Sequence, residues 1–285
     1  MSSSEKITGA MKMISSAKVH KNEQELRKLQ PFRAQLQHIM GHILASDATF
    51  ESPLIESKEV RKIAVVVFGS DDGLCGAYNM NVFKKLLEEL NRLHETFGND
   101  VDITVIPVGR KIAGAVSHIV SDSIKSKPVA GVDSKMAPEK VDAFTMSLKD
   151  GFTGDEYDYV EVVYMHFHSI SRQRATVETL FPVKPEILLG NQDAAGKKES
   201  GRMYLFEPDA NSIFNEVLPM FVLSTMQDIT IENRASEQAA RVMAMQAAND
   251  NAKKLNEELR LEYNKLRQQS ITTELLDILG GQVER

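Results

Sequence analysis

The feature that most limits the fold of this chain is a long stretch near its C-terminus, residues 220–279, that contains neither glycine nor proline. At a rise of ~1.5 Å per residue, roughly 60 helical residues would form a rod about 90 Å long. Helices of globular domains usually have about 8–20 residues, so a rod of this length needs a second helix beside it. The sequence therefore predicts a long helical pair rather than a compact helical domain.

The N-terminal segment is the other long stretch with helical periodicity, and we expect it to be the partner. Ile7, Met11 and Ile14 recur at spacings of four and three, which places them on one face of a helix. Pro31 lies inside this pattern and is expected to interrupt or kink the helix, because proline removes a backbone hydrogen bond. The apolar stripe continues through Leu26, Leu29, Leu36, Ile39, Met40 and Ile43.

Between the two helical arms, strand-like and helix-like segments alternate. Residues 61–69, "RKIAVVVFG", form a short apolar run rich in β-branched residues, which is typical of a buried strand. Residues 81–98 follow as an amphipathic helix. This alternation predicts a mainly parallel sheet covered on both faces. The other expected segments are strands at 101–109, 157–169 and 174–183, helices at 110–120 and 138–152, and a polar loop at 188–203.

These segments predict an α/β fold: a long antiparallel coiled coil of the N- and C-terminal helices with an inserted Rossmann-like α/β domain. We expect an N-terminal coiled-coil helix in 1–57, the inserted domain in 58–206, and a C-terminal helix in 207–285 that pairs with the first.

Charge and cysteine content exclude several classes of protein. The net charge of −6 and the pI of about 5.7 give no electrostatic reason to expect nucleic-acid binding. The single cysteine, Cys75, permits no intramolecular disulfide and fits a reducing compartment. The longest apolar run, 63–68, is too short to span a bilayer, and the N-terminus has no signal-peptide core. Any membrane association is therefore expected to go through a partner.

A glycine-containing turn, "FGSDDGLCGAYN" at 68–79, follows the first predicted strand. Its glycines are spaced G-x3-G-x2-G, whereas a dinucleotide-binding turn has the spacing G-x-G-x2-G. Asp71 and Asp72 would repel a phosphate. A second near-match, "GKK" at 196–198, misses the phosphate-loop spacing by one residue and lacks Ser or Thr after the lysine. Both patterns favour structural turns over nucleotide binding.

Few other residues suggest chemistry. His38 and His42 are four apart on a predicted helix and could share a metal, but no third ligand is evident, which favours a solvated or packed pair. His166 and His168 alternate on one strand face and suit ordinary packing or exposure. Cys75 fits a small buried residue at a helix start better than a nucleophile. The sequence thus predicts no catalytic residues, no metal and no cofactor.

The end of the long helix carries a concentrated apolar tip, which Gly280 and Gly281 are expected to cap. Exposed apolar surface of this kind would be a liability in a free monomer, so it indicates a surrounding sleeve; the alternative is that the tip folds back on its own chain. The tip consists of Leu275, Leu276, Ile278 and Leu279.

Four motifs, taken in order, carry a resemblance to a known family. They are "KITGAMKMISSAK" at 6–18, "SDDGLCGAYN" at 70–79, "SEQAARVMAMQAANDNA" at 236–252 and "RQQSITTELLDILGG" at 267–281. Together they resemble the gamma subunits of F-type ATP synthases, and the similarity covers essentially the whole chain. The two terminal motifs are highly specific, while the glycine turn alone would be a weaker signal.

The resemblance implies a rotor shaft without catalytic residues of its own. In that family the shaft stands inside a hexamer of alternating alpha and beta subunits, rests on a ring of c subunits and binds epsilon along its lower part. Proton flow turns the shaft, which forces the catalytic beta sites through their binding states. The implied location is peripheral, on the cytoplasmic face of a bacterial inner membrane, with membrane contact only through the c-ring and no nucleic-acid partner.

The resemblance also implies which residues contact the hexamer. By motif match, Met11 and Arg241 correspond to positions that face the lever region of beta. The alternative for each charged residue is a solvated helix face. Asp72 departs from the family pattern, because many relatives carry Arg or Lys there. The residues that correspond to contacts with the catch loops of the surrounding subunits are Arg267, Gln268, Thr272 and Glu274.

Two other functions remain as alternatives: a coiled-coil tether or scaffold with an α/β head, and a small-molecule enzyme that uses the glycine turn.

The family resemblance also implies a register for the helix pair. The numbers of two residues that face each other across the pair should add up to about 250, which places Met1 level with Asn249 to Ala252. We therefore expect either that the native chain starts upstream of Met1 or that its C-terminal arm is ordered only inside the hexamer. The apolar residues expected to lack a helix partner are Leu255, Leu259, Tyr263 and Leu266.

Overall fold

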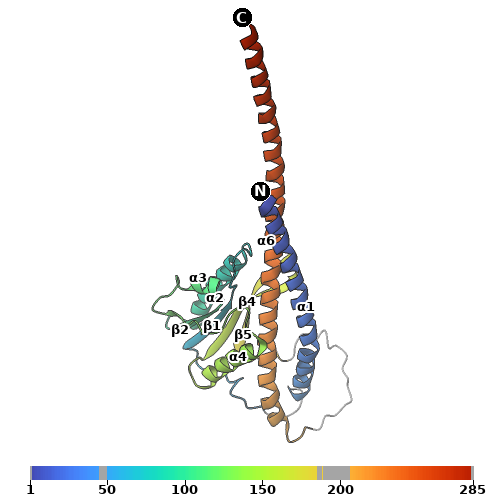
Figure 1. The fold of residues 1–285 in the computed structure, drawn as a ribbon. Coiled ribbons are helices and arrows are strands. Elements are labelled where there is room, and N and C mark those ends of the chain that lie inside the picture. Colours follow the sequence, from blue (N-terminus) through green and yellow to red (C-terminus); the bar gives the residue numbers. More distant parts are fainter. Residues whose placement is uncertain (1, 45–49, 185–187, 189–205, 284–285) are drawn as a thin grey trace.

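Two long helices form a rod, and an α/β domain lies against one side of it (Figure 1). The structure is a computed structural model and describes residues 2–44, 50–184, 188 and 206–283. The first helix, α1 (Ser2–Leu44), runs antiparallel to the last, α6 (Ala210–Val283), and the N-terminus lies part-way along α6 (Figure 1). This arrangement confirms the predicted fold class of a terminal-helix coiled coil with an inserted Rossmann-like domain.

In the first turns of α1, the residues turned toward α6 are not the ones the apolar stripe predicts, whereas Leu36, Met40 and Ile43 of the same stripe are buried as expected. Ile7 and Ile14 are 59% and 57% exposed, whereas Ser15 and Val19 are buried. Val19 packs with small and branched side chains of α6, among them Ala239. Small side chains on α6 allow the two helices to approach closely at Val19. The expected inward position of Ile7 and Ile14 was wrong. α1 also continues through Pro31 as one helix instead of being interrupted there.

The register of the helix pair differs from the prediction as well. The Asn249 side-chain nitrogen donates a hydrogen bond of 2.8 Å to the carbonyl oxygen of Glu5, and Arg33 pairs with Asp228 farther down. Facing residue numbers therefore sum to 254 at one level and 261 at the other, not to about 250. The first residues of α1 consequently lie level with residues one or more helical turns farther along α6 than expected.

The central sheet has five strands in the order β3-β2-β1-β4-β5. The first four are parallel, which confirms the predicted mainly parallel sheet, and the last pairs antiparallel with β4 through a tight hairpin. The three-residue strand β3 was not predicted, because so short a segment shows no periodicity. The strands are β1 (Lys62–Phe68), β2 (Asp102–Val108), β3 (Ile124–Ser126), β4 (Tyr159–Ser169) and β5 (Arg172–Phe181).

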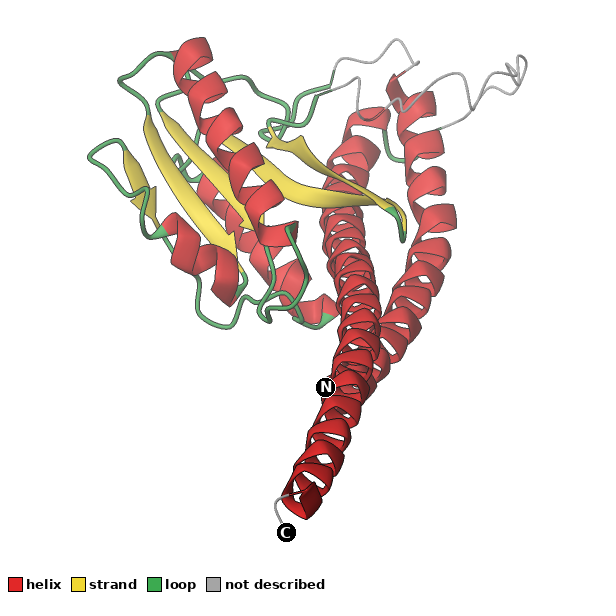
Figure 2. Cartoon of the chain, turned by 90° about the horizontal axis from the view of Figure 1, so that it is seen from above, coloured by secondary structure: helices red, strands yellow, loops and turns green. Residues whose placement is uncertain are grey.

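Helices cover both faces of this sheet (Figure 2), because strand side chains point alternately to opposite sides. On β1, Val65 packs with the helices α2 and α3, while Val66 packs with α4 and the coiled coil. The coiled coil thus forms part of the domain's own core. The helices of the domain are α2 (Tyr78–Phe97), α3 (Arg110–Val116) and α4 (Pro138–Thr153).

The last third of α6 projects beyond the domain (Figure 1). Every side chain from Glu257 to Leu276 is exposed. The helix continues through Gly280 and Gly281 to Val283, so the predicted glycine cap was wrong; glycine costs a helix only about 1 kcal/mol. The residues expected to lack a helix partner, Leu255, Leu259, Tyr263 and Leu266, are 41%, 42%, 66% and 58% exposed, which confirms that expectation for the described chain.

The expected domain boundaries at 57 and 206 fall between elements, since α1 ends at Leu44, β1 begins at Lys62, β5 ends at Phe181 and α6 begins at Ala210. We keep them as a proposal. The near-match to a phosphate loop at 196–198 lies outside the described residues. In the part of the chain that the structure describes, no helix is both long enough and apolar enough to cross a membrane.

Candidate functional site

Five of the six predicted site residues fall in two places on the molecule. Arg241 lies where the glycine turn after β1 meets α6, and Met11 is half-buried on α1. The other four residues lie on the exposed end of α6. The first place is a dense polar junction between the domain and the rod, and the second is a bare helix.

The glycine turn is shaped by backbone conformations that few residues adopt. Gly76 has a φ of +59°, and Leu74 has a φ of 63°, which is uncommon for a residue with a side chain. Asn79 fixes the turn internally: its side-chain oxygen accepts from the Ser70 backbone nitrogen at 3.0 Å, and its nitrogen donates to Ser70 Oγ at 2.7 Å. Cys75 is buried at the foot of α2, as predicted.

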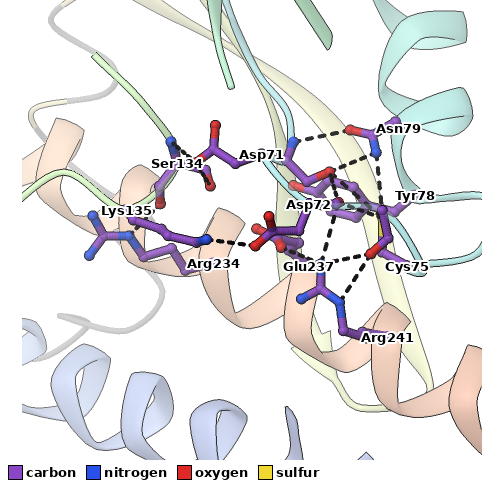
Figure 3. A network of polar contacts seen from close by, with 12 residues as sticks. Asp71, Asp72, Cys75, Tyr78, Asn79, Ser134, Lys135, Arg234, Glu237 and Arg241 are labelled. Carbon is purple, nitrogen blue, oxygen red and sulfur yellow. Dashed lines mark hydrogen bonds and ion pairs between the residues drawn. The ribbon is translucent and has the colours of Figure 1, made fainter. Parts of the chain in front are cut away.

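The two aspartates of the turn hold neighbouring loops (Figure 3). Buried Asp71 accepts hydrogen bonds from the backbone nitrogens of Arg110 and Ser134 and from the Ser134 hydroxyl at 2.7 Å. Asp72 pairs with Lys135 at 2.6 Å, and this hydrogen bond holds the pKa of the Asp72 carboxyl below its usual range. Both carboxylates are thus engaged by groups of the chain itself, in the manner of a structural turn.

Arg241 connects the turn to α6 (Figure 3). Its guanidinium donates to the carbonyl oxygens of Gly73 and Asp72, at 3.2–3.5 Å, and to the Glu237 carboxylate at 2.7 Å. The side chains of Arg241 and Glu237 are only 8% and 3% exposed. Burial raises the pKa of Glu237, although the Arg241 guanidinium opposes this. Arg241 therefore points into the junction, and its implied contact with beta stays a prediction.

Further bonds extend the junction along α6. Asn233 accepts a hydrogen bond of 2.5 Å from the buried Tyr78 hydroxyl, and the Ser236 hydroxyl donates to the Met165 carbonyl oxygen at 2.9 Å. Arg234 donates to the carbonyl oxygens of Ser134, at 2.8 Å, and of Met136. Because these bonds join α6 to three separate parts of the domain, the rod and the domain are held as one rigid unit at this level.

A second polar cluster joins α1, α6 and the β4–β5 hairpin. Arg33 of α1 pairs with Asp228 of α6 and lies 3.8 Å from the Glu178 carboxylate of β5. His166 of β4 hydrogen-bonds Glu232 of α6 at 2.5 Å. Burial raises the pKa of both Glu178 and Glu232. This cluster could not be predicted from the sequence, because the residues that contact each other are up to 195 positions apart and no local motif marks them.

The exposed end of α6 carries the remaining predicted residues. Arg267, Gln268, Thr272 and Glu274 are all exposed, and the Thr272 hydroxyl donates to the carbonyl oxygen of Gln268 within the helix. A bare helix presents such side chains to any molecule that surrounds it. Their role against neighbouring subunits stays a prediction.

Comparisons with known proteins agree on one family. The family model described as ATP synthase matches residues 1–283. The ATP synthase gamma chain of Bacteroides thetaiotaomicron is 35% identical over 287 residues, which cover 99% of this chain and 95% of that protein. The ATP synthase gamma chain of Cupriavidus pinatubonensis is 33% identical over 276 residues, which cover 97% of this chain and 92% of that protein.

Two solved structures share the fold. A chain of the central stalk and c-ring of the Tetrahymena thermophila mitochondrial ATP synthase has a TM-score of 0.56 at 23% identity and covers 85% of this chain and 99% of that one. A chain of the Euglena gracilis mitochondrial ATP synthase has a TM-score of 0.52 at 20% identity, with coverage of 96% and 94%. At these identities the likeness concerns the fold alone.

Proposed function

The chain belongs to the family of ATP synthase gamma chains, as the resemblance of its motifs indicates, and we propose that it is the rotating central shaft of such a synthase. In this proposal the shaft couples transmembrane proton flow to ATP synthesis at catalytic sites on the surrounding alpha and beta subunits. It has no catalytic residue and no cofactor of its own.

One observation carries this proposal: α6 is a single helix of 74 residues. One part of it is attached to the α/β domain, and its C-terminal part is exposed. Its length is about 110 Å at ~1.5 Å per residue. Where α6 meets the domain, buried hydrogen bonds at Asn233 and Arg241 resist twisting of the helix against the domain. Beyond Glu257 it offers an exposed apolar and polar surface. A rod of this kind is suited to transmit torque from a base to a surrounding sleeve.

The partners follow from the same proposal. The exposed end of α6 would lie inside the alpha/beta hexamer, and the domain with the lower coiled coil would contact the epsilon subunit and the c-ring. The chain would then be peripheral on the cytoplasmic face of a bacterial inner membrane and would touch the membrane only through the c-ring. A tether or scaffold would not need the polar residues at the exposed end of α6. Replacing these residues therefore distinguishes a rotating shaft from a tether.

Replacing Arg267 and Gln268 together with alanine is expected to lower ATP-driven proton pumping by about tenfold or more while leaving the fold intact. Each charge-assisted hydrogen bond to a surrounding loop contributes about 1.5–3 kcal/mol, and about 1.4 kcal/mol corresponds to a factor of ten. Proton pumping is measured in inverted membranes that carry the assembled synthase, and assembly is checked by co-purification of the alpha and beta subunits.

The matched control is the double variant Arg260→Ala, Gln269→Ala, which removes the same two residue types from equally exposed positions on the same helix. It is expected to pump nearly as well as the unaltered synthase. If both double variants pump normally in assembled complexes, the proposed grip of Arg267 and Gln268 is wrong. Failure of the unaltered chain to co-purify with alpha and beta would instead defeat the proposed function itself.

The isolated chain is expected neither to bind nor to hydrolyse ATP appreciably. In the glycine turn Asp71 is buried and already accepts three hydrogen bonds, and the Asp72 carboxylate, paired with Lys135, adds a negative charge that would repel a phosphate. Isothermal calorimetry with ATP and a phosphate-release assay test this directly. Micromolar binding by the purified chain would favour the small-molecule enzyme, whereas addition of alpha and beta subunits is expected to produce ATPase activity.

A further inference from the structure

One buried threonine of α6 has a hydroxyl group that the rest of the described chain leaves without a partner. Thr225 is only 4% exposed, and its Oγ1 makes no hydrogen bond to any described residue. Such a hydroxyl lowers the stability of a fold, because its hydrogen bonds to bulk water are lost on folding and not replaced. The proposed shaft function gives Thr225 no role.

The other threonines in the described helices show that Thr225 is exceptional. A threonine inside a helix commonly donates its hydroxyl hydrogen to the carbonyl oxygen four residues before it. Thr230, five residues farther along α6, is also buried and donates to the Met226 carbonyl oxygen at 2.8 Å. Thr225 makes no such bond to the carbonyl oxygen of Phe221. The seven threonines that do bond in this way are Thr8, Thr96, Thr145, Thr153, Thr230, Thr272 and Thr273.

A small cavity lies beside Thr225, between α6 and the end of β5. Its volume is about 10 Å³, which is close to the least space that a single water molecule occupies. Thr225 and Glu178 both line it. The cavity is therefore too small for any organic ligand and has room for one water. The apolar residues around it are Leu180, Val183, Phe221 and Val222.

Glu178 supplies a hydrogen-bond acceptor at this cavity. Its carboxylate accepts a hydrogen bond of 3.2 Å from the Tyr164 hydroxyl and lies 3.8 Å from the Arg33 guanidinium. A carboxylate has about four acceptor positions, so these two contacts leave some of them free. A bound water needs at least two polar partners, and the Thr225 hydroxyl together with the Glu178 carboxylate provides them.

We propose that this cavity is a binding site for one ordered water molecule, which bridges the Thr225 hydroxyl of α6 and the Glu178 carboxylate of β5. Thr225 donates its hydroxyl hydrogen to the water oxygen, and the water donates a hydrogen to the carboxylate. A hydrogen bond mediated by water is nearly as favourable as a direct one. The bridge ties α6 to the sheet closer to the start of the helix than Arg241 does, and it does not depend on the proposed function.

Thr225→Val tests the bridge in the isolated full chain, because valine keeps the branched shape of threonine and removes only the hydroxyl. Loss of a partner from the bridging water is expected to raise the equilibrium constant of unfolding by about five- to thirtyfold. A hydroxyl without any partner predicts the opposite sign, because valine would then remove an uncompensated polar group. Urea unfolding followed by circular dichroism measures the change.

Thr230→Val is the matched control, since it is the same substitution at a buried position of the same helix. The Met226 carbonyl oxygen keeps its backbone hydrogen bond within the helix after this change, so no buried group is left unpaired. The equilibrium constant of unfolding is therefore expected to rise by a smaller factor than in Thr225→Val.

A crystal structure of the full chain that shows ordered water tests the site directly. The expected result is a water molecule within hydrogen-bonding distance of both Thr225 Oγ1 and the Glu178 carboxylate, which is lost in Thr225→Val. A dry cavity would overturn the proposal, as would a Thr225 hydroxyl bonded to the Phe221 carbonyl oxygen or directly to Glu178. A Thr225→Val variant that is as stable as the unaltered chain, or more stable, would also overturn it.

Discussion

Replacing Arg241 with alanine is expected to lower the free energy of unfolding of the isolated chain by about 3 kcal/mol or more. The change leaves the Glu237 carboxylate, 3% exposed, without its guanidinium partner, and loss of one member of a buried ion pair costs about 3–5 kcal/mol. It also removes the donors to the Gly73 and Asp72 carbonyl oxygens. Urea unfolding followed by circular dichroism measures the effect.

A double-mutant cycle isolates the ion pair. In a Glu237→Gln background no buried charge is left unpaired, so Arg241→Ala should cost at least about 1 kcal/mol less than in the unaltered chain, within the usual range of coupling energies. Arg260→Ala, at an exposed position of the same helix, should change stability by less than about 0.5 kcal/mol.

The result also separates two roles for Arg241. A role in holding the glycine turn to α6 predicts instability of the free chain, whereas a role only against the beta subunit predicts a defect confined to the assembled complex. If the free Arg241→Ala variant unfolds at the same urea concentration as the unaltered chain, the structural role is wrong and the contact implied by the family resemblance gains support. Loss of stability in the free chain would mean that any pumping defect of this variant must be corrected for misfolding.

The long helix and the buried strands could be predicted from the sequence because each leaves a local signature. The run without glycine or proline at 220–279 marks most of α6, although the helix begins earlier, at Ala210, and continues to Val283. The run of β-branched residues around Val65 marks a strand buried on both faces. The glycine turn was also recognisable, since its spacing and its two aspartates argue against a phosphate site. In these cases the deciding interactions lie within a few residues of one another.

The details of the helix pair could not be predicted in the same way. Periodicity shows that Ile7 and Ile14 share a face of α1, but it does not show which face meets α6, and the structure turns Ser15 and Val19 inward instead. The register depends on contacts such as Asn249 with Glu5, which are 244 residues apart. One sequence contains no signal for such pairs. The same reason explains why the Arg33 cluster was missed.

A buried pair of carboxylates gives the molecule a stability that depends on pH. Glu161 of β4 and Glu89 of α2 are 2% and 3% exposed, and the Arg92 guanidinium contacts both. Glu161 Oε1 also accepts a hydrogen bond of 2.8 Å from the Tyr159 hydroxyl, while Oε2 is buried without a partner among the described residues. Burial, reinforced by Glu89, raises the pKa of Glu161 to about 7.

The raised pKa of Glu161 makes the folded chain more stable at low pH than at high pH. The folded chain holds the Glu161 proton up to about pH 7, while the unfolded chain releases it near the ordinary glutamate pKa of about 4.3. Between these values the folded state binds more protons, so the free energy of unfolding falls as pH rises. The stabilisation is complete below about pH 4 and lost above about pH 7. At 1.36 kcal/mol per pKa unit, the change over this range is about 3 kcal/mol.

Glu161→Gln is therefore expected to gain about 3 kcal/mol in free energy of unfolding relative to the unaltered chain when the pH is raised from 4 to 8. Glutamine keeps the shape of the protonated carboxyl and does not titrate, and all other carboxylates are common to both proteins. Denaturant unfolding at several pH values gives the difference directly. Glu88→Gln, at a half-exposed position of α2, is the control and should track the unaltered chain at every pH. A constant difference between Glu161→Gln and the unaltered chain from pH 4 to pH 8 would show that Glu161 is ionised in the fold throughout, held so by Arg92.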